Sequence, residues 1–242
     1  MLRFGCVPYL NAKPLIEGLA RVELRAPAQL GELLARGRVD AALLPSIEVL
    51  RAGLAVVPGI AIASPGPADS VKLHLRRPLD RVRTVLLDRA SRSTNALARL
   101  VLEKRHALRP RYVSREPADA AVTIGDASFR EFGCPSLDLA TEWREWTGLP
   151  FVFALWAHER DHPQAAAIRR ALKTAKAAGR RALEPIIERE HRRIGIDRDR
   201  CRLYLTERIT YDLGAAERRG LARFARLARE AGLLEKEGVL VS

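Results

Sequence analysis

The sequence predicts an α/β protein built from two lobes, and three observations carry this prediction. Short apolar strands alternate with helices through the first half of the 242-residue chain. Extended apolar segments near residues 70–76 and 150–156 follow strand–helix units, so they can carry the chain from one lobe to the other and back. From Pro163 onwards the pattern becomes helical, which predicts a helical C-terminal part on the first lobe.

The first lobe is expected to start with alternating strands and helices, which indicates a mostly parallel sheet covered by helices. Proline at a first helical position, serine at a cap and glycine at a helix end mark the helix boundaries. Strands are predicted at Leu2–Val7, Val22–Arg25 and Val39–Leu44, and helices at Asn11–Ala20, from Pro27 to Gly37 and at Ile47–Ala52. An apolar run at Leu54–Ala63 and a turn cluster at Ser64–Pro67 follow.

The second lobe is expected to be a smaller unit of the same kind. Ser91 or Ser93 can cap its helix, whose apolar stripe includes Leu97, Leu100 and Val101 at helical spacing. Its strands, with the two extended segments that connect the lobes, are predicted at Ser70–Leu75, Thr84–Leu87, Arg111–Val113, Ala120–Ile124 and Leu149–Trp156.

The last third of the chain predicts long helices. One apolar stripe runs from Ile168 to Ile186, and Pro185 is expected to break or kink that helix. A final amphipathic helix carries apolar residues from Leu221 to Ala231. The predicted lobes are therefore residues 1–75 together with 155–242, and residues 76–154.

The composition is that of an ordinary globular chain, with 48% hydrophobic and 29% charged residues. Its net charge of +13 could indicate a nucleic-acid partner, but many arginines alternate with glutamates on predicted helix faces, which is typical of a solvated surface. We therefore expect no nucleic-acid partner. We also expect the electrostatic field of the positively charged protein to favour an anionic ligand. No apolar run suggests a membrane helix, and the first residues do not resemble a signal peptide, so we expect a cytoplasmic protein without a membrane partner.

The cysteines and histidines do not indicate a metal site. Cys6, Cys134 and Cys201 lie far apart, so we expect small buried side chains rather than disulfides or zinc ligands. His158 and His162 have a spacing of four but straddle a predicted loop. The sequence also lacks a Walker loop and a Gly-x-Gly-x-x-Gly motif. We therefore expect neither a metal nor another cofactor.

Polar side chains follow four of the predicted strands, at strand ends where α/β proteins bind their ligands. Asn11 and Ser46 each lie where a helix is expected to begin, so either residue could be a ligand contact or a plain cap. Ser70 enters the first extended segment between the lobes. The loop Asp88–Asn95 combines hydroxyls, an arginine and helix N–H groups, which suit a carboxylate or a phosphate as well as simple capping.

Six regions in chain order resemble one family, the chorismate dehydratases of menaquinone biosynthesis. They are Tyr9–Leu15, Val39–Glu48, Leu87–Thr94, Ile124–Ala127, Leu137–Leu139, and Glu142-Trp143 with Thr147–Ala154. The resemblance covers about residues 4–158, and Ser93-Thr94 departs from it because the family more often reads Thr-Ser there.

The resemblance implies a fold similar to the type II periplasmic-binding-protein plan. It also implies the futalosine route, in which chorismate loses water to give 3-[(1-carboxyvinyl)oxy]benzoate without a metal or redox cofactor. Asn11 and Ser70 would be the catalytic residues, flanking the reacting ring. The remaining residues would bind the dicarboxylate substrate: Tyr9, Ser46, Ser91, Arg92, Ser93, Thr94, Gly125 and Asp126. The sequence does not decide the oligomeric state, and a homodimer is possible.

Three alternatives remain at this stage. A related lyase of the same pathway makes 1,4-dihydroxy-6-naphthoate with a histidine as base, but residues 91–95 contain no histidine and no Thr-Thr-Ala run. A non-catalytic cytoplasmic protein that binds a small anion would share the fold. The effector domain of a DNA-binding regulator is disfavoured, because no helix-turn-helix precedes Leu2.

Overall fold

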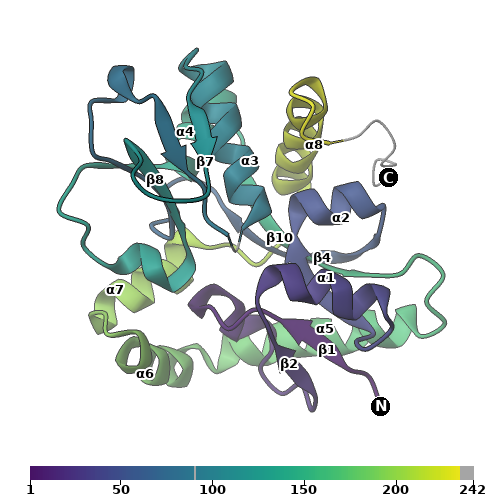
Figure 1. The fold of residues 1–242 in the computed structure, drawn as a ribbon. Coiled ribbons are helices and arrows are strands. Elements are labelled where there is room, and N and C mark those ends of the chain that lie inside the picture. Colours follow the sequence, from purple (N-terminus) through teal and green to yellow (C-terminus); the bar gives the residue numbers. More distant parts are fainter. Residues whose placement is uncertain (90, 235–242) are drawn as a thin grey trace.

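The computed structural model describes residues 1–89 and 91–234, which form two lobes that each contain one five-stranded sheet (Figure 1). The strand order is β2-β1-β3-β10-β4 in the first sheet and β7-β6-β8-β5-β9 in the second. Helices cover both sheets, as the alternation of strands and helices predicted. None of the helices in the described part of the chain is long and apolar enough to cross a membrane.

In the first sheet, four strands run in one direction and β10 runs against them. Strand β1 pairs in parallel with β2 and β3, while β10 lies antiparallel between β3 and β4. The sheet is therefore mostly parallel, as expected. Its strands are β1 (Phe4–Cys6), β2 (Val22–Leu24), β3 (Ala41–Pro45), β4 (Ala55–Ser64) and β10 (Phe151–His158).

The second sheet repeats this plan, with β5 as its one reversed strand. Strand β6 pairs in parallel with β7 and β8, and β5 lies antiparallel between β8 and β9. Its strands are β5 (Val71–Leu75), β6 (Thr84–Leu86), β7 (Arg111–Val113), β8 (Ala120–Ile124) and β9 (Ser136–Asp138).

The reversed strands β5 and β10 are the first that the chain forms after it changes lobes. The crossings therefore lie within residues 65–70 and 148–150, beside the extended segments in which the sequence predicted them. We propose the boundaries between the lobes from the sheet to which each strand belongs. Sheet membership favours boundaries inside these two crossings, because β5 belongs to the second sheet and the whole of β10 to the first.

Thirteen helical segments complete the described residues, and one of the expected helices differs in form. The predicted helix Asn11–Ala20 is a 3-10 helix that ends at Leu15, because Pro14 lacks an N–H group and Gly18 has φ +76°. The stripe Ile168–Ile186 is split at Ala182, with Pro185 in the first turn of the second helix, as predicted.

The short helices are η1 (Leu10–Leu15), η2 (Leu79–Arg81), η4 (Gly125–Phe129) and the π segments η3 (Val101–Arg105) and η5 (Tyr204–Arg208). The α-helices are α1 (Pro27–Ala35), α2 (Ser46–Ala52), α3 (Arg92–Leu100), α4 (Leu139–Thr147), α5 (Ala165–Arg181), α6 (Leu183–Ile194), α7 (Arg198–Leu203) and α8 (Ala215–Glu230).

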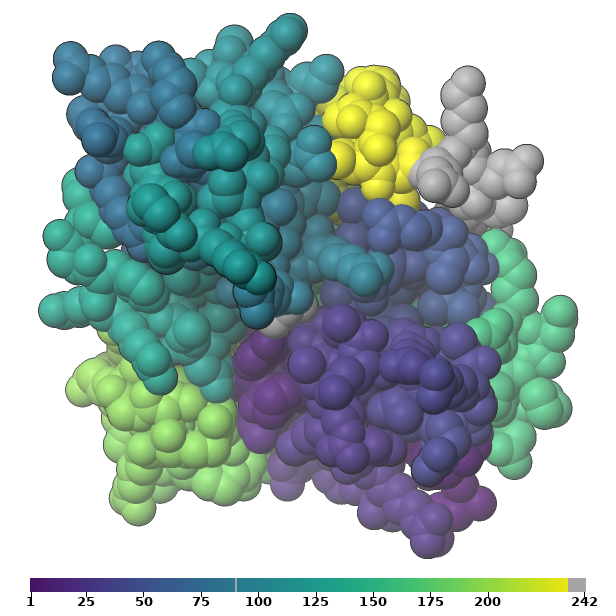
Figure 2. Space-filling view, in the orientation of Figure 1, coloured from purple at the N-terminus to yellow at the C-terminus, as the bar shows by residue number. Residues whose placement is uncertain are grey.

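The C-terminal helices contact both lobes rather than the first alone (Figure 2). Helix α8 packs against β10, α2 and α3. Its Phe224 lies edge-on to Phe151 at 4.9 Å and to Trp143 at 6.3 Å between ring centroids. A Cβ on Gly220 would come within 2.1 Å of the Pro150 carbonyl, so only glycine lets α8 approach the second crossing this closely. These contacts fix the relative position of the lobes.

Candidate active site

A cavity of about 520 Å³, including its open mouth, lies between the two lobes. Among the described residues, none that lines it carries a charged side chain. The lining residues are Val7, Tyr9, Asn11, Pro27, Leu43, Pro45, Ile62, Ser70, Val71, Ser91, Thr94, Ile124, Gly125, Phe153 and Ala154.

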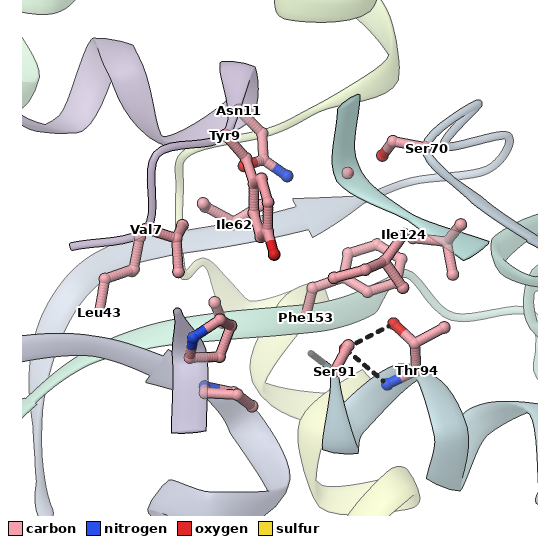
Figure 3. A pocket seen from close by; sticks show the side chains of 15 residues that line it. Val7, Tyr9, Asn11, Leu43, Ile62, Ser70, Ser91, Thr94, Ile124 and Phe153 are labelled. Carbon is pink, nitrogen blue, oxygen red and sulfur yellow. Dashed lines mark hydrogen bonds between the residues drawn. The ribbon is translucent and has the colours of Figure 1, made fainter. Parts of the chain in front are cut away.

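Six of the ten residues predicted to form the site line this cavity: Tyr9, Asn11, Ser70, Ser91, Thr94 and Gly125. Figure 3 shows Asn11 and Ser70 on one side of the space and Ser91 and Thr94 on the opposite side, with the Tyr9 ring between them. Asn11 comes from the first lobe, Ser70 from the first crossing, and the other pair from the second lobe. The cavity therefore needs both lobes to be complete.

The start of η1, which carries Tyr9 and Asn11, is held by the second lobe. The backbone N–H of Leu10 donates a 2.9 Å hydrogen bond to Oδ1 of Asp126. The other carboxylate oxygen of Asp126 accepts a 2.8 Å hydrogen bond from Arg193 on α6. Asp126 thus positions the part of the chain that carries Tyr9 and Asn11, without lining the cavity itself.

Tyr9 closes the cavity against Gly125. Gly125 has φ +58°, and a Cβ there would come within 3.0 Å of the Tyr9 ring. Both observations require glycine at this position. Burial raises the pKa of Tyr9, and the negative charges of Asp88 and Asp126 raise it further. The Tyr9 hydroxyl therefore stays protonated at neutral pH and can donate a hydrogen bond to a ligand.

Ser70 lies at the end of a rigid loop. Asp138 accepts hydrogen bonds from the N–H groups of Ala68 at 3.0 Å and Asp69 at 2.7 Å. Burial raises the pKa of Asp138, although the N–H groups that it accepts from act to lower it. Asp69 has φ +58°, which is uncommon outside glycine, and its carboxylate accepts a 2.9 Å hydrogen bond from Arg208. This network fixes the backbone that presents Ser70.

The Ser70 side chain has a partner that the sequence did not reveal. Tyr204, at the start of η5, donates a 2.8 Å hydrogen bond to Oγ of Ser70. Oδ1 of Asn11 is buried and has no hydrogen-bond partner among the described residues. No motif could have indicated Tyr204, since it lies 134 positions from Ser70 in the helical part of the chain, beyond the region of resemblance.

The N-terminus of α3 forms the opposite side of the cavity. Oγ of Ser91 accepts a 3.2 Å hydrogen bond from the N–H of Thr94, which confirms Ser91 as the helix cap. The Ser91 hydroxyl in turn donates a 2.9 Å hydrogen bond to Oγ1 of Thr94. Two hydroxyls and the positive end of a helix therefore lie at one place, which suits a carboxylate.

Ser46 and Ser93 do not line this cavity, because their hydroxyls are fully buried in the contact between the lobes. They lie 3.2 Å apart, and Ser46 donates a 2.7 Å hydrogen bond to the Val152 carbonyl. Ser93 accepts a 3.1 Å hydrogen bond from the N–H of Ile47. The structure therefore places both serines in the contact that joins α2 to α3.

Arg92 and Asp126 also lie outside the lining. The Arg92 guanidinium is largely exposed and forms a 3.1 Å ion pair with Glu48 on α2. Burial raises the pKa of Glu48, while the charges of Arg92 and Arg51 lower it. Because Arg92 pairs with Glu48 and is absent from the cavity lining, its position does not support the predicted contact with a carboxylate.

The remaining expectations concern the cysteines, the histidines and metal ligands. Cys6 and Cys201 are buried, Cys134 is partly buried and all three are free, as predicted. His74 and His158 are buried. Within residues 1–89 and 91–234, no group of three or more His, Cys, Asp or Glu side chains could hold a metal ion.

A family model described as "Menaquinone biosynthesis" matches residues 2–230. The chain belongs to this menaquinone-biosynthesis family. A chorismate dehydratase from Thermus thermophilus is 32% identical, over 91% of this chain and 93% of the relative. Membership therefore confirms the family that the six regions resembled, and it extends the match into the C-terminal helices.

Solved structures confirm the fold class. Protein AF1704 from Archaeoglobus fulgidus superposes with a TM-score of 0.74, at 15% identity, over 96% of this chain and 98% of that one. The periplasmic aliphatic sulphonate binding protein SsuA from Escherichia coli superposes with a TM-score of 0.65, at 16% identity, over 98% of this chain and 94% of that one. The fold of this family member is thus that of periplasmic binding proteins, with a helical C-terminal part.

Proposed function

We propose that this member of the menaquinone-biosynthesis family is a chorismate dehydratase. It would eliminate water from chorismate and release 3-[(1-carboxyvinyl)oxy]benzoate, as a hydro-lyase of the futalosine route. Family membership and the name of the Thermus thermophilus relative support this proposal. The structural observation that carries it is the neutral cavity, with Asn11 and Ser70 facing the N-terminus of α3.

The reaction suits a cavity without charged side chains. Chorismate loses the proton on C3 and the hydroxyl on C4, and its ring becomes aromatic, so most of the driving force is internal to the substrate. The C3 proton is γ to an unsaturated carboxylate, which spreads the negative charge as the proton leaves. The protein has to orient the two breaking bonds and to stabilise the developing charge.

The arrangement of the cavity supports the following placement of the substrate. One carboxylate would lie at the start of α3, beside the hydroxyls of Ser91 and Thr94. Asn11 and Ser70 would then face the breaking bonds on the other side and would hydrogen-bond the leaving hydroxyl or the delocalised anion. Tyr9 would cover the ring. The base is proposed to be the enolpyruvyl carboxylate of the substrate, since no lining side chain can serve as a carboxylate or imidazole base.

The test is to incubate the purified protein with chorismate and to follow the product by mass and by absorbance. Loss of one water with a rise in aromatic absorbance is the expected result. Asn11→Ala and Ser70→Ala should each lower kcat by about 10²–10³-fold, as loss of a preorganised hydrogen-bond donor does elsewhere. Ser136→Ala, at an exposed strand end, serves as the control and should keep wild-type turnover.

Each other outcome separates the alternatives. Binding of chorismate without turnover would contradict the proposal and favour a non-catalytic anion-binding protein. Turnover of a cyclic futalosine instead of chorismate would favour the naphthoate-forming lyase. Near-wild-type turnover by folded Asn11→Ala and Ser70→Ala variants would contradict the roles given to these two residues.

A further inference from the structure

We infer that Tyr204 is a positioning residue of this site, which acts through the Ser70 hydroxyl and turns the proton of that hydroxyl toward the substrate. The inference rests on the proposed function, because it concerns how Ser70 contributes to the elimination. Tyr204 does not line the cavity. Its hydroxyl contacts the cavity lining through a hydrogen bond to Ser70, so we expect its effect on the reaction to pass through Ser70.

Tyr204 is held in one position by its surroundings. Its side chain is 1% exposed, and its ring lies edge-on to Phe129 at 5.0 Å between centroids. It is the first residue of η5, where the N–H of Ile209 donates a 3.1 Å hydrogen bond to the Tyr204 carbonyl across five residues. Such π segments are rare and occur often at functional sites, because they redirect a side chain from a helix.

The hydrogen bond between Tyr204 and Ser70 has a defined direction. A phenol is a stronger acid than an aliphatic alcohol, so the Tyr204 hydroxyl donates and Oγ of Ser70 accepts, at 2.8 Å. A serine hydroxyl has one proton to donate and two lone pairs with which to accept. Because Tyr204 occupies one lone pair, the Ser70 proton remains available for another acceptor.

No protein group takes that proton within residues 1–89 and 91–234, where Oγ of Ser70 appears only as an acceptor. The backbone around Ser70 cannot rotate freely either. Its carbonyl accepts hydrogen bonds from the N–H of Gly125 at 2.8 Å and from the Ser128 hydroxyl at 3.1 Å. The free Ser70 proton therefore faces the cavity that Ser70 lines, where a hydroxyl or a carboxylate of the substrate can accept it.

Tyr204 keeps its proton while it performs this role. Burial raises the pKa of Tyr204 well above that of an ordinary phenol, although interactions with Ser70 and Asn11 act to lower it. The Tyr204 hydroxyl therefore keeps the proton that it donates to Oγ of Ser70.

The test compares Tyr204→Phe with Tyr211→Phe in the full-length protein. Both changes remove one buried phenol hydroxyl, but the Tyr211 hydroxyl has no hydrogen-bond partner among the described residues. Tyr204→Phe should lower kcat for chorismate by about 10–100-fold and change KM by less than about threefold, as expected when one charge-stabilising hydrogen bond is weakened. Tyr211→Phe should keep wild-type kcat and KM.

A double-mutant cycle shows whether Tyr204 acts through Ser70. The Ser70→Ala, Tyr204→Phe double variant should have about the same kcat as Ser70→Ala alone, because the group that Tyr204 orients is already gone. Additive losses in kcat would overturn this route of action. A fluorotyrosine at position 204 keeps the ring and the hydroxyl, so folding is preserved, and kcat should change as the phenol becomes a stronger donor.

The outcomes distinguish this inference from the proposed function. If the wild-type protein converts chorismate and both Tyr204→Phe and the fluorotyrosine protein match its kcat, the inference is wrong and the proposed function stands. If the wild-type protein does not convert chorismate, the proposed function is wrong, and the inference is overturned with it.

Discussion

Oδ1 of Asp126 accepts a 2.9 Å hydrogen bond from the N–H of Leu10, and the two residues belong to different lobes. Leu10 is the first residue of η1, between Tyr9 and Asn11. A single carboxylate of the second lobe therefore holds the segment that lines the first lobe's side of the cavity. It follows that the lobe contact and the geometry of the proposed site depend on each other.

Substitution of Asp126 tests this dependence. Asp126→Ala leaves the N–H of Leu10 without its acceptor, which should lower the free energy of unfolding by about 1–3 kcal/mol and raise KM for chorismate. Asp126→Asn keeps an oxygen for Leu10 but loses the charge that pairs with Arg193. Kinetic measurements should therefore find that KM of the Asp126→Asn variant is close to the wild-type value and that KM of the Asp126→Ala variant is raised. Equal impairment would show that the ion pair, rather than the Leu10 contact, matters.

Gly125 offers a second test, which separates the backbone cost of a positive φ from the contact between a Cβ and the Tyr9 ring. Gly125→Ala introduces a residue at φ +58° and places a Cβ within 3.0 Å of the Tyr9 ring. Gly133→Ala introduces a residue at φ +62°, where a Cβ would have open space. In both variants the positive φ should lower the free energy of unfolding by about 1–2 kcal/mol. Gly125→Ala should in addition raise KM, because Tyr9 has to move, whereas Gly133→Ala should leave KM unchanged.

Thermal unfolding and chorismate kinetics on the two glycine variants would check this comparison. An unchanged KM for a folded Gly125→Ala protein would mean that Tyr9 is not a substrate contact. That result would remove Tyr9 from the site and leave the roles of Asn11 and Ser70 in place.

The fold could be predicted from the sequence because its signals are local. Pro27 and Gly53 mark helix ends by their own backbone preferences, and apolar strands such as Ala41–Pro45 read directly as buried. The helix α4 (Leu139–Thr147) was missed although its signals are local, since Asp138 caps the N–H groups of Ala140 and Thr141 and Gly148 ends the helix. What the sequence does not show is that the same Asp138 carboxylate also accepts from the distant N–H groups of Ala68 and Asp69. Such contacts cannot be read from neighbouring residues.

The site was predictable only in part, for the same reason. Sequence position identified the loops that meet, so Asn11, Ser70 and Thr94 were found. It could not distinguish a hydroxyl that faces the cavity from one that faces the other lobe, and it therefore grouped Ser93 with Thr94. One step along a helix turns a side chain by about 100°, and here that step separates the two roles.

Ser93 and Thr94 should accordingly give opposite phenotypes. Ser93→Ala removes the acceptor of the Ile47 N–H and the partner of Ser46, so the free energy of unfolding should fall by about 1–3 kcal/mol while kcat and KM stay near wild type. Thr94→Val keeps the shape but removes a hydroxyl from the cavity lining, so KM should rise by about tenfold with a smaller loss of stability. Denaturant unfolding and steady-state kinetics on both variants measure the difference. A raised KM for Ser93→Ala with unchanged stability would restore Ser93 as a substrate contact.

His74 should make stability depend on pH in the mildly acidic range. It is 4% exposed on β5, and Nε2 lies 2.9 Å from Oγ1 of Thr123. Burial lowers the pKa of His74 below 6.5, and the charges of Lys72 and Arg76 lower it further. Below pH 6.5 the unfolded chain therefore binds a proton that the folded chain does not bind, and the free energy of unfolding falls as the pH falls toward the folded pKa.

The expected slope is at most about 1.4 kcal/mol per pH unit, the limit for one proton. Urea unfolding between pH 7.5 and pH 5 should show the decrease in the wild type and a flatter profile in His74→Gln. His191→Gln, at the end of α6, is the matched control for replacing a histidine with glutamine elsewhere in the chain. Arg3 holds the pKa of Asp40 below its ordinary value, whereas burial raises the pKa of Asp138 and of Glu48. These carboxylates are present in both proteins, so the difference in slope between the wild type and His74→Gln reports His74. Identical slopes for the wild type and His74→Gln would show that His74 is not the group that senses pH here.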